Sequence, residues 1–188
     1  METAERRYPV GIQTFSEIRK GNYVYIDKTD LVWELTKLKY VFLSRPRRFG
    51  KSLLSSTLHS YFDGRKDLFE GLKIMALEKD WEQYPVIHLD MSTAKNQPNA
   101  KELQDTLLYN MEPLAAQFGR TETETTPGKL LTGMIRRAYE QTGKQVVIII
   151  DEYDAPLLEV IDDSNQYHEH LRLFVELHLY FLKLLHFL

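Results

Sequence analysis

The chain of 188 residues contains no cysteine. This absence excludes a disulfide framework and any thiolate metal site, and it is typical of a protein in a reducing compartment. A large excess of charge is also lacking, because the formal net charge is −3 at pH 7, so no overall charge favours nucleic acid or an anionic membrane. The charged N-terminus, Met-Glu-Thr-Ala-Glu-Arg-Arg, is not followed by the apolar core of a secretory signal. We therefore expect a cytoplasmic protein.

Several familiar catalytic and membrane patterns are missing as well. The sequence has no nucleophile elbow, no His-Glu-x-x-His and no glycine-rich dinucleotide fingerprint. His168 and His170 have no third ligand at zinc spacing, so we expect both at the surface. The apolar stretch 171–188 is interrupted by charged residues and histidines, and it has no uncharged run of about eighteen residues. We therefore expect no membrane span there, but a helix or strand that is buried against further sheet.

One short segment carries the strongest indication of a binding site. In Val41-Phe-Leu-Ser-Arg-Pro-Arg-Arg-Phe-Gly-Lys-Ser52, Gly-Lys-Ser stands between an apolar run and a helical pattern. The run Tyr40 to Leu43 predicts a buried strand, and residues 52–62 predict a helix. The expected inward face of this helix comprises Leu54, Leu58, Tyr61 and Phe62. Unpaired N–H groups and the helix dipole would both favour an anion where this helix begins.

Each residue of this loop has a physical role in binding phosphate. Gly50 allows close approach of the backbone, Lys51 reaches the outer phosphates, and the Ser52 hydroxyl can ligate magnesium. The usual pattern has another glycine five residues before Gly50, where this chain has Arg45.

A second segment, Gln145-Val-Val-Ile-Ile-Ile-Asp-Glu-Tyr-Asp154, ends an apolar run in two adjacent acids. The run predicts a central strand covered on both faces, with Asp151 at its carboxyl end, where open α/β sheets bind ligands. In P-loop ATPases an acid in this place holds magnesium, and the next acid orients and deprotonates the attacking water. We assign these roles to Asp151 and Glu152.

Each of these two patterns also has an ordinary structural explanation. A lone Gly-Lys-Ser is weak evidence, and acids commonly begin a turn or cap a helix after a strand. Here both patterns occur in the expected order, about a hundred residues apart. Asp90, at the end of a further predicted strand within 85–91, can either approach the metal or cap the following turn.

The remaining pattern predicts an α/β fold with a parallel sheet. Residues 1–39 form an N-terminal extension whose helix starts at Asp27 or Thr29, and residues 40–188 form the core. A connector leads from Asp63-Gly64 to the strand in 85–91. Two further helices are expected near 100–118 and 128–142, and the polar run 121–126 between them is expected to be an exposed loop. The inward side chains of the first helix are expected to be Leu31, Val32, Leu35 and Leu38.

Four of these segments together resemble the bacterial AAA-ATPase-like family. They are Tyr25-Ile-Asp-Lys-Thr29, Ser44-Arg-Pro-Arg-Arg-Phe-Gly-Lys-Ser52, Ile87-His-Leu-Asp90 and Ile150-Asp-Glu-Tyr-Asp-Ala-Pro156. The resemblance makes Arg45 an expected residue, and it implies a three-layer, AAA-related P-loop NTPase fold with ATP and magnesium as ligands. The implied catalytic residues are Lys51 and Glu152, and the implied metal ligands are Ser52 and Asp151. The implied nucleotide-binding residues are Arg45, Arg47, Arg48, Phe49, Gly50, Lys51, Ser52 and Leu53.

The three arginines of this loop admit three interpretations. They can surround a triphosphate with charge, bind the phosphates of nucleic acid, or belong to a solvated basic loop.

Family members usually continue into a domain that resembles PD-(D/E)XK nucleases, and nothing in this chain matches it. We therefore expect a fold that is incomplete at its C-terminus, in a fragment of a longer protein. The resemblance implies that the absent domain is a possible site of contact with nucleic acid. The sequence does not indicate an oligomeric state.

Two functions from different classes follow from these patterns. The first is an ATPase that couples its nucleotide state to an attached effector. The second is a nucleotide-binding regulatory or scaffold domain without hydrolysis. A small-molecule kinase is a third possibility, although no acceptor pocket can be identified.

Overall fold

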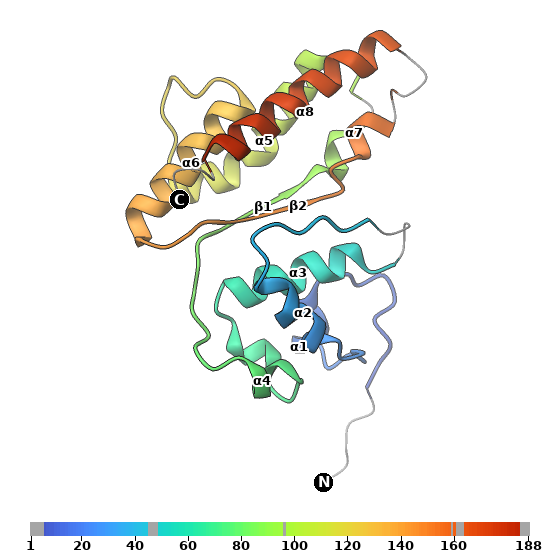
Figure 1. Ribbon diagram of the computed structural model, residues 1–188. Helices are drawn as coiled ribbons and strands as arrows, with labels where there is room; N and C mark the ends of the chain where they lie inside the picture. Colours follow the sequence, from blue (N-terminus) through green and yellow to red (C-terminus); the bar gives the residue numbers. More distant parts are fainter. Residues whose placement is uncertain (1–5, 45–48, 96, 159, 161–163, 185–188) are drawn as a thin grey trace. The chain divides into compact units, whose positions relative to one another are not determined.

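Helices and a two-stranded sheet are distributed over two compact units, Met1–Val86 and Ile87–Leu188 (Figure 1). The computed structural model describes residues 6–44, 49–95, 97–158, 160 and 164–184. Unit 1 carries the described part of the predicted phosphate loop, and unit 2 carries the two predicted acids. The division after residue 39 that the sequence suggests stays a prediction.

Unit 1 consists of short helices. Its elements are α1 (Phe15–Lys20), α2 (Thr29–Thr36), α3 (Lys51–Phe62), the 3-10 turn η1 (Lys66–Phe69) and α4 (Ile74–Leu77). The helix α3 packs against α1 and α2, and α2 packs against α4. The two helices predicted for this part of the chain are therefore confirmed in α2 and α3.

An aromatic cluster forms the core of unit 1. The ring of Phe15 lies 5.2 Å from the ring of Tyr25 and 4.7 Å from that of Phe69, between centroids. Phe69 also contacts Trp81, at 5.1 Å. Phe69 and Ile74 are fully buried, although both lie in the segment that the sequence presents as a connector. Residues 65–84 therefore supply core rather than merely linking two elements.

The Asp27 carboxylate joins two segments of unit 1 that are far apart in the sequence. Its Oδ1 accepts hydrogen bonds from the backbone N–H and the hydroxyl of Thr29, at 2.9 and 2.7 Å, and its Oδ2 accepts from the N–H of Lys73, at 2.7 Å. The buried Thr29 hydroxyl in turn accepts from the N–H of Ile74, at 3.1 Å. Partial burial raises the pKa of Asp27, but the hydrogen bonds from Thr29 and Lys73 outweigh it and lower the pKa overall.

Replacing Asp27 with Ala should lower the free energy of unfolding of unit 1 by about 1–3 kcal/mol, because three donors lose their acceptor. Asp27→Asn should lower the free energy of unfolding by less, since the amide oxygen can still accept from Thr29. Both tryptophans, Trp33 and Trp81, lie in unit 1, so tryptophan fluorescence during urea unfolding measures the effect. The matched control is Glu34→Ala, which removes an exposed ion pair and should cost less than about 1 kcal/mol. Equal losses for the two alanine variants would contradict this role.

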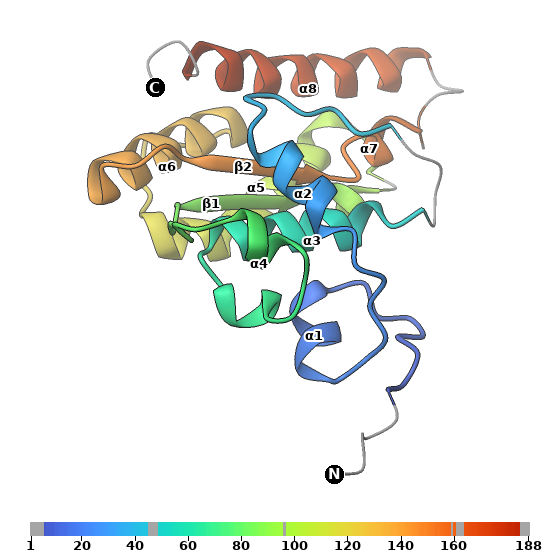
Figure 2. The same ribbon diagram turned by 60° about the horizontal axis from the view of Figure 1, so that its bottom comes forward.

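Unit 2 combines a small parallel sheet with helices (Figure 2). Its elements are β1 (Val86–Asp90), η2 (Met91–Ala94), α5 (Ala100–Phe118), α6 (Pro127–Thr142), β2 (Val147–Asp151), α7 (Ala155–Leu158) and α8 (Ser164–Leu184). The strand β1 includes Val86, the last residue of unit 1, and pairs with β2. The helices α5, α6 and α8 pack against one another. Both strands and both predicted helices are therefore confirmed, as is a mixed α/β architecture.

The core of unit 2 is formed where β1 meets α5 and α6. Ile87 and Leu89 alternate on one face of β1 and belong to the same cluster as the apolar sides of both helices. Local signals define the helix boundaries. The Asn99 side chain accepts from the N–H of Glu102 to start α5, whereas Thr126 caps α6 and Gly143 ends it with a φ of 66°.

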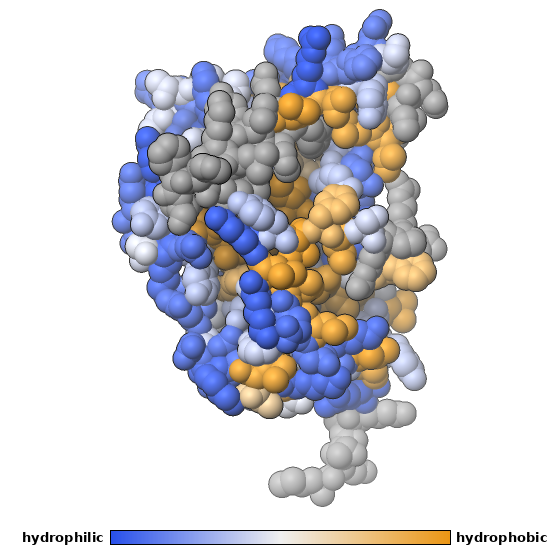
Figure 3. Space-filling model, viewed as in Figure 1, coloured by the Kyte–Doolittle hydropathy of each residue, from blue (hydrophilic) through white to orange (hydrophobic). Residues whose placement is uncertain are grey.

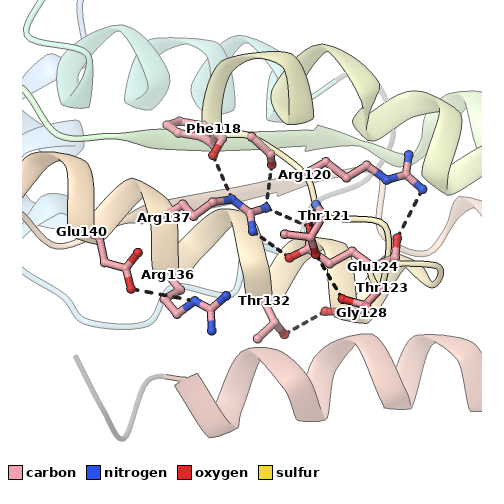
Figure 4. Close-up of polar contacts among 11 residues, drawn as sticks. Phe118, Arg120, Thr121, Thr123, Glu124, Gly128, Thr132, Arg136, Arg137 and Glu140 are labelled. Atoms are coloured by element: carbon pink, nitrogen blue, oxygen red, sulfur yellow. Dashed lines mark hydrogen bonds and ion pairs between the residues drawn. The ribbon is translucent and has the colours of Figure 1, made fainter.

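A buried ion pair fixes the connection between α5 and α6 (Figure 4). The Arg137 guanidinium donates to both carboxylate oxygens of Glu124, at 2.7 and 3.0 Å, and to the carbonyl oxygens of Phe118 and Gly119, at 3.0 and 2.6 Å. The guanidinium holds the pKa of Glu124 below its usual range. A Cβ on Gly133 would stand 1.7 Å from Glu124 Oε1, so only glycine fits under this pair. The expectation of an exposed loop over 121–126 is therefore wrong at Glu124, which is 6% exposed.

The predicted strand before the phosphate loop is not formed. Residues 40–44 are irregular, and the exposed fractions of Tyr40, Val41 and Phe42 are 56%, 45% and 72%. A strand requires a partner for its backbone, and the sheet of the described residues consists of β1 and β2. Other apolar side chains also reach the surface, as the face drawn in Figure 3 shows.

Other expectations about burial are corrected too. In α2, Val32 is buried but Leu31 is 57% exposed, and Leu38, which lies beyond the end of α2, is also 57% exposed. In α3 the buried residues are Thr57 and Ser60 rather than the apolar residues of the predicted inward face. Their hydroxyls donate to the carbonyls of Leu53 and Ser56. These internal hydrogen bonds satisfy the hydroxyls within the helix itself.

The strand β2 is half-buried rather than covered on both faces. Ile148 packs on the core of α5 and α6, whereas Ile150 is 36% exposed. On α8, His168 is exposed as predicted, but His170 is 1% exposed. The Nδ1 of His170 lies 3.4 Å from the carbonyl oxygen of Pro156, because α8 packs against α7.

Candidate functional site

The first part of the candidate site is the start of α3. Gly50 is the N-cap residue, with φ 75° and ψ 26°, and no atom of the described residues lies within 4 Å of the position where a Cβ would stand. Its left-handed backbone allows Lys51 to begin the helix directly after the turn. Among the described residues, no side chain caps the first N–H groups of α3. This end of the helix therefore has the N–H donors and the positive dipole that favour an anion.

Side chains of the first turn of α3 lie at the surface or half-buried. Lys51, Ser52 and Leu53 are half-buried, and Phe49 is 65% exposed. Within the described ranges, neither the Lys51 ammonium nor the Ser52 hydroxyl has a hydrogen-bonding partner. The helix itself is anchored deeper in unit 1, where the N–H of Phe15 donates to the Ser56 hydroxyl at 3.0 Å. The polar groups assigned to phosphate are thus placed by a fixed helix.

Three predicted loop residues, Arg45, Arg47 and Arg48, lie outside the described residues. Their assignment to nucleotide phosphates stays a prediction.

The second part of the candidate site is the end of β2 in unit 2. Asp151 is half-buried, and its Oδ1 accepts from the N–H of Glu152 at 3.0 Å. Glu152 has a φ of 52°, in the left-handed region that residues with a Cβ seldom adopt. Its carbonyl oxygen accepts from the N–H of Ala155, at 3.0 Å, where α7 begins. The two acids therefore stand on a tight turn between a strand and a helix.

Asp90 ends β1, the neighbour of β2. Its Oδ1 accepts from the N–H of Ser92 at 2.8 Å, so Asp90 caps η2. Of the two interpretations of Asp90 that the sequence allows, the capping role is confirmed.

The residues of the candidate site belong to two units. Gly50 to Leu53 stand together at the start of α3, and Asp151 and Glu152 stand together after β2. We propose that these two groups bind one ligand together.

Sequence reasoning missed three polar arrangements. In the link from Asp27 to Lys73, the contact of Asp27 with Thr29 could have been predicted, because Asp-x-Thr before a helix is a common capping pattern. The contact with Lys73 could not. The pair of Glu124 and Arg137 leaves no such signal, since thirteen residues separate two ordinary charges. The third arrangement comprises Asp90, Thr93 and Asn110, which line a cleft at the end of β1.

Comparison with known proteins identifies the family. A family model described as "Predicted AAA-ATPase" matches residues 9–187. The chain belongs to this AAA-ATPase-like family. A relative from Azotobacter chroococcum mcd 1, an uncharacterized protein in the vnfD 5′ region, is 36% identical over 163 residues, which are 83% of this chain and 30% of the relative. No solved structure matches the chain.

The chain thus spans less than a third of the length of that relative. Membership of the family suggests nucleotide binding. None of the helices, as far as the structure describes them, combines the length and hydropathy of a membrane span.

Proposed function

We propose that this chain is the ATP-binding module of a magnesium-dependent ATPase. The observation that carries the proposal is the start of α3 in unit 1. There a left-handed Gly50 precedes Lys51 and Ser52 at a helix terminus that no side chain of the described residues caps, in a member of the AAA-ATPase-like family. This arrangement would suit the terminal phosphates of a nucleotide, because backbone N–H groups at the start of α3 and the Lys51 amine would both interact with the same anion.

The residues of the loop would divide the work of binding. Lys51 would pair with the outer phosphates, and Gly50 would allow the backbone to approach them. Phe49 and Leu53 would flank the site, and the arginines at 45, 47 and 48 would add positive charge around the triphosphate. The exposed Phe49 ring offers an apolar surface beside the loop.

The acids after β2 would serve the metal and the water. The Ser52 hydroxyl and the Asp151 carboxylate are hard oxygen ligands, which fit magnesium when phosphate oxygens complete its shell. The metal would neutralise charge on the phosphates. Glu152, held on its turn by the hydrogen bond to Asp151, would orient the attacking water and accept its proton.

We further propose that the nucleotide state controls an effector domain of a longer protein, in which a nuclease-like domain acts on nucleic acid. The length of the relative from Azotobacter chroococcum mcd 1, of which this chain matches 30%, leaves room for such a domain.

The proposal is tested at Lys51. We expect Lys51→Ala to weaken ATP binding about 10- to 100-fold, because a charged hydrogen bond to phosphate is lost. Equilibrium binding of a fluorescent ATP analogue, with and without magnesium, measures the effect. The control Lys66→Ala removes an exposed lysine of the same unit and should bind like the wild type. Equal affinities of Lys51→Ala and the wild type would overturn the site, provided that tryptophan fluorescence shows unit 1 to be folded.

A further inference from the structure

A cleft of about 340 Å³ opens in unit 2 beside the end of β1, and its lining includes none of the residues assigned to ATP. It is bounded by the end of β1, by η2, by the middle of α5 and by the start of α6 at Pro127. Its volume lies in the range of roughly 300–1,000 Å³ that is typical of sites for small molecules. The carboxyl end of a strand is also where open α/β sheets bind ligands.

The floor of the cleft is apolar. It is formed by Leu107, Met111 and Leu114 of α5 together with Met91 of η2. Met91, Leu107 and Met111 are almost fully buried and belong to the core of unit 2, so the floor is rigid. A ligand would therefore place an apolar body against these side chains.

The polar rim of the cleft contains one carboxylate, that of Asp90, together with Thr93, Asn110 and His88. The Asn110 amide nitrogen donates to the Thr93 hydroxyl at 2.7 Å, which leaves the Asn110 carbonyl oxygen to accept. Asp90 is exposed, and while its Oδ1 accepts from Ser92, its Oδ2 can accept from a ligand. A carboxylate that lines a mostly apolar cleft favours a cation.

We propose that this cleft binds a small organic cation, an ammonium or guanidinium group on an apolar body. The cation would lie at Asp90, and the body would cover Leu107 and Met111. The proposal is independent of ATP binding, since it uses only residues of unit 2 and neither Asp151 nor Glu152.

The chain offers a direct readout, because it has five methionines and two of them, Met91 and Met111, line the cleft. Methyl-¹³C-methionine NMR of the full chain is followed during titration with 2-phenylethylamine. The neutral 2-phenylethanol is the matched ligand. We expect saturable shifts of Met91 and Met111, no shift of Met75 in unit 1, and about tenfold weaker binding of the alcohol.

Two variants complete the test. Asp90→Asn retains the acceptor for the Ser92 N–H, and should weaken binding of the amine about tenfold while leaving that of the alcohol unchanged. The control Asp105→Asn removes an exposed carboxylate of α5 outside the cleft and should bind like the wild type. Absence of shifts at Met91 and Met111, or equal binding of amine and alcohol that Asp90→Asn does not alter, would overturn the proposal. If Lys51→Ala binds 2-phenylethylamine with the affinity of the wild type, the cleft is a site separate from that of ATP.

Discussion

The variant Glu152→Gln should hydrolyse ATP about 10²- to 10⁴-fold more slowly than the wild type and still bind it. Glutamine has the shape of glutamate and can orient a water, but it cannot accept the proton. The substitution would also retain the hydrogen bond to Asp151, because its donor is the backbone N–H of residue 152. Magnesium-dependent phosphate release, measured beside equilibrium ATP binding on the same preparation, separates the two effects.

The matched control for this variant is Glu140→Gln, which changes an exposed glutamate of α6 in the same unit. It should release phosphate at the rate of the wild type. Equal rates for wild type and Glu152→Gln would show that this acid is not the base. ATP binding by a wild type that releases no phosphate would favour the regulatory, non-hydrolytic function.

The variant Arg137→Ala should lose about 3–5 kcal/mol of the free energy of unfolding of unit 2. The side chains of Arg137 and Glu124 are only 17% and 8% exposed, so alanine leaves a buried carboxylate without its cation and two carbonyls without their donor. Urea unfolding followed by far-UV circular dichroism is suitable, because unit 2 contains no tryptophan. The neighbouring Arg136 is the control, since its side chain is 64% exposed and its contact with Glu140 is 3.9 Å long. Arg136→Ala should cost less than about 1 kcal/mol, and equal losses would contradict the account of Arg137.

The same pair predicts a dependence of stability on pH. The pKa of Glu124 is lowered in the folded state, mainly by Arg137, so the unfolded chain binds the proton more readily. The contribution of Glu124 is therefore complete above the unfolded pKa of about 4.3, and it is lost as the pH falls through the lower folded value. The variant Glu124→Gln should lack this part of the acid dependence, which urea unfolding at several pH values measures.

Much of the fold could be predicted because it depends on local patterns. The helices at 100–118 and 127–142 follow from apolar periodicity and from caps such as Asn99, and both strands follow from short apolar runs. The core of unit 1 could not be predicted in this way. Phe69 and Ile74 stand in very short elements, where no period can develop, and their burial depends on contacts with Phe15 and Trp81.

The run 40–43 shows the limit of the same reasoning. Its composition suits a strand, but a strand is defined by pairing with a distant segment, which composition does not encode.

The candidate site divides in a similar way. The glycine, lysine and serine at the start of α3 could be predicted, since they follow one another and the helix beyond them is periodic. The pair of Asp151 and Glu152 could be predicted from the strand before it. The left-handed backbone of Glu152 could not, because glutamate has no preference for it. Likewise the cleft beside Asp90 combines residues of four elements, and no sequence spacing brings them together.

At Glu152 the residue that would be best for stability differs from the residue that the proposed chemistry requires. A residue with a Cβ costs roughly 1–2 kcal/mol in that conformation, and glycine would avoid the cost. If Glu152 acts on water as proposed, replacing it with glycine would raise the stability of the protein and abolish ATP hydrolysis. Selection for thermal stability alone would therefore remove the catalytic acid.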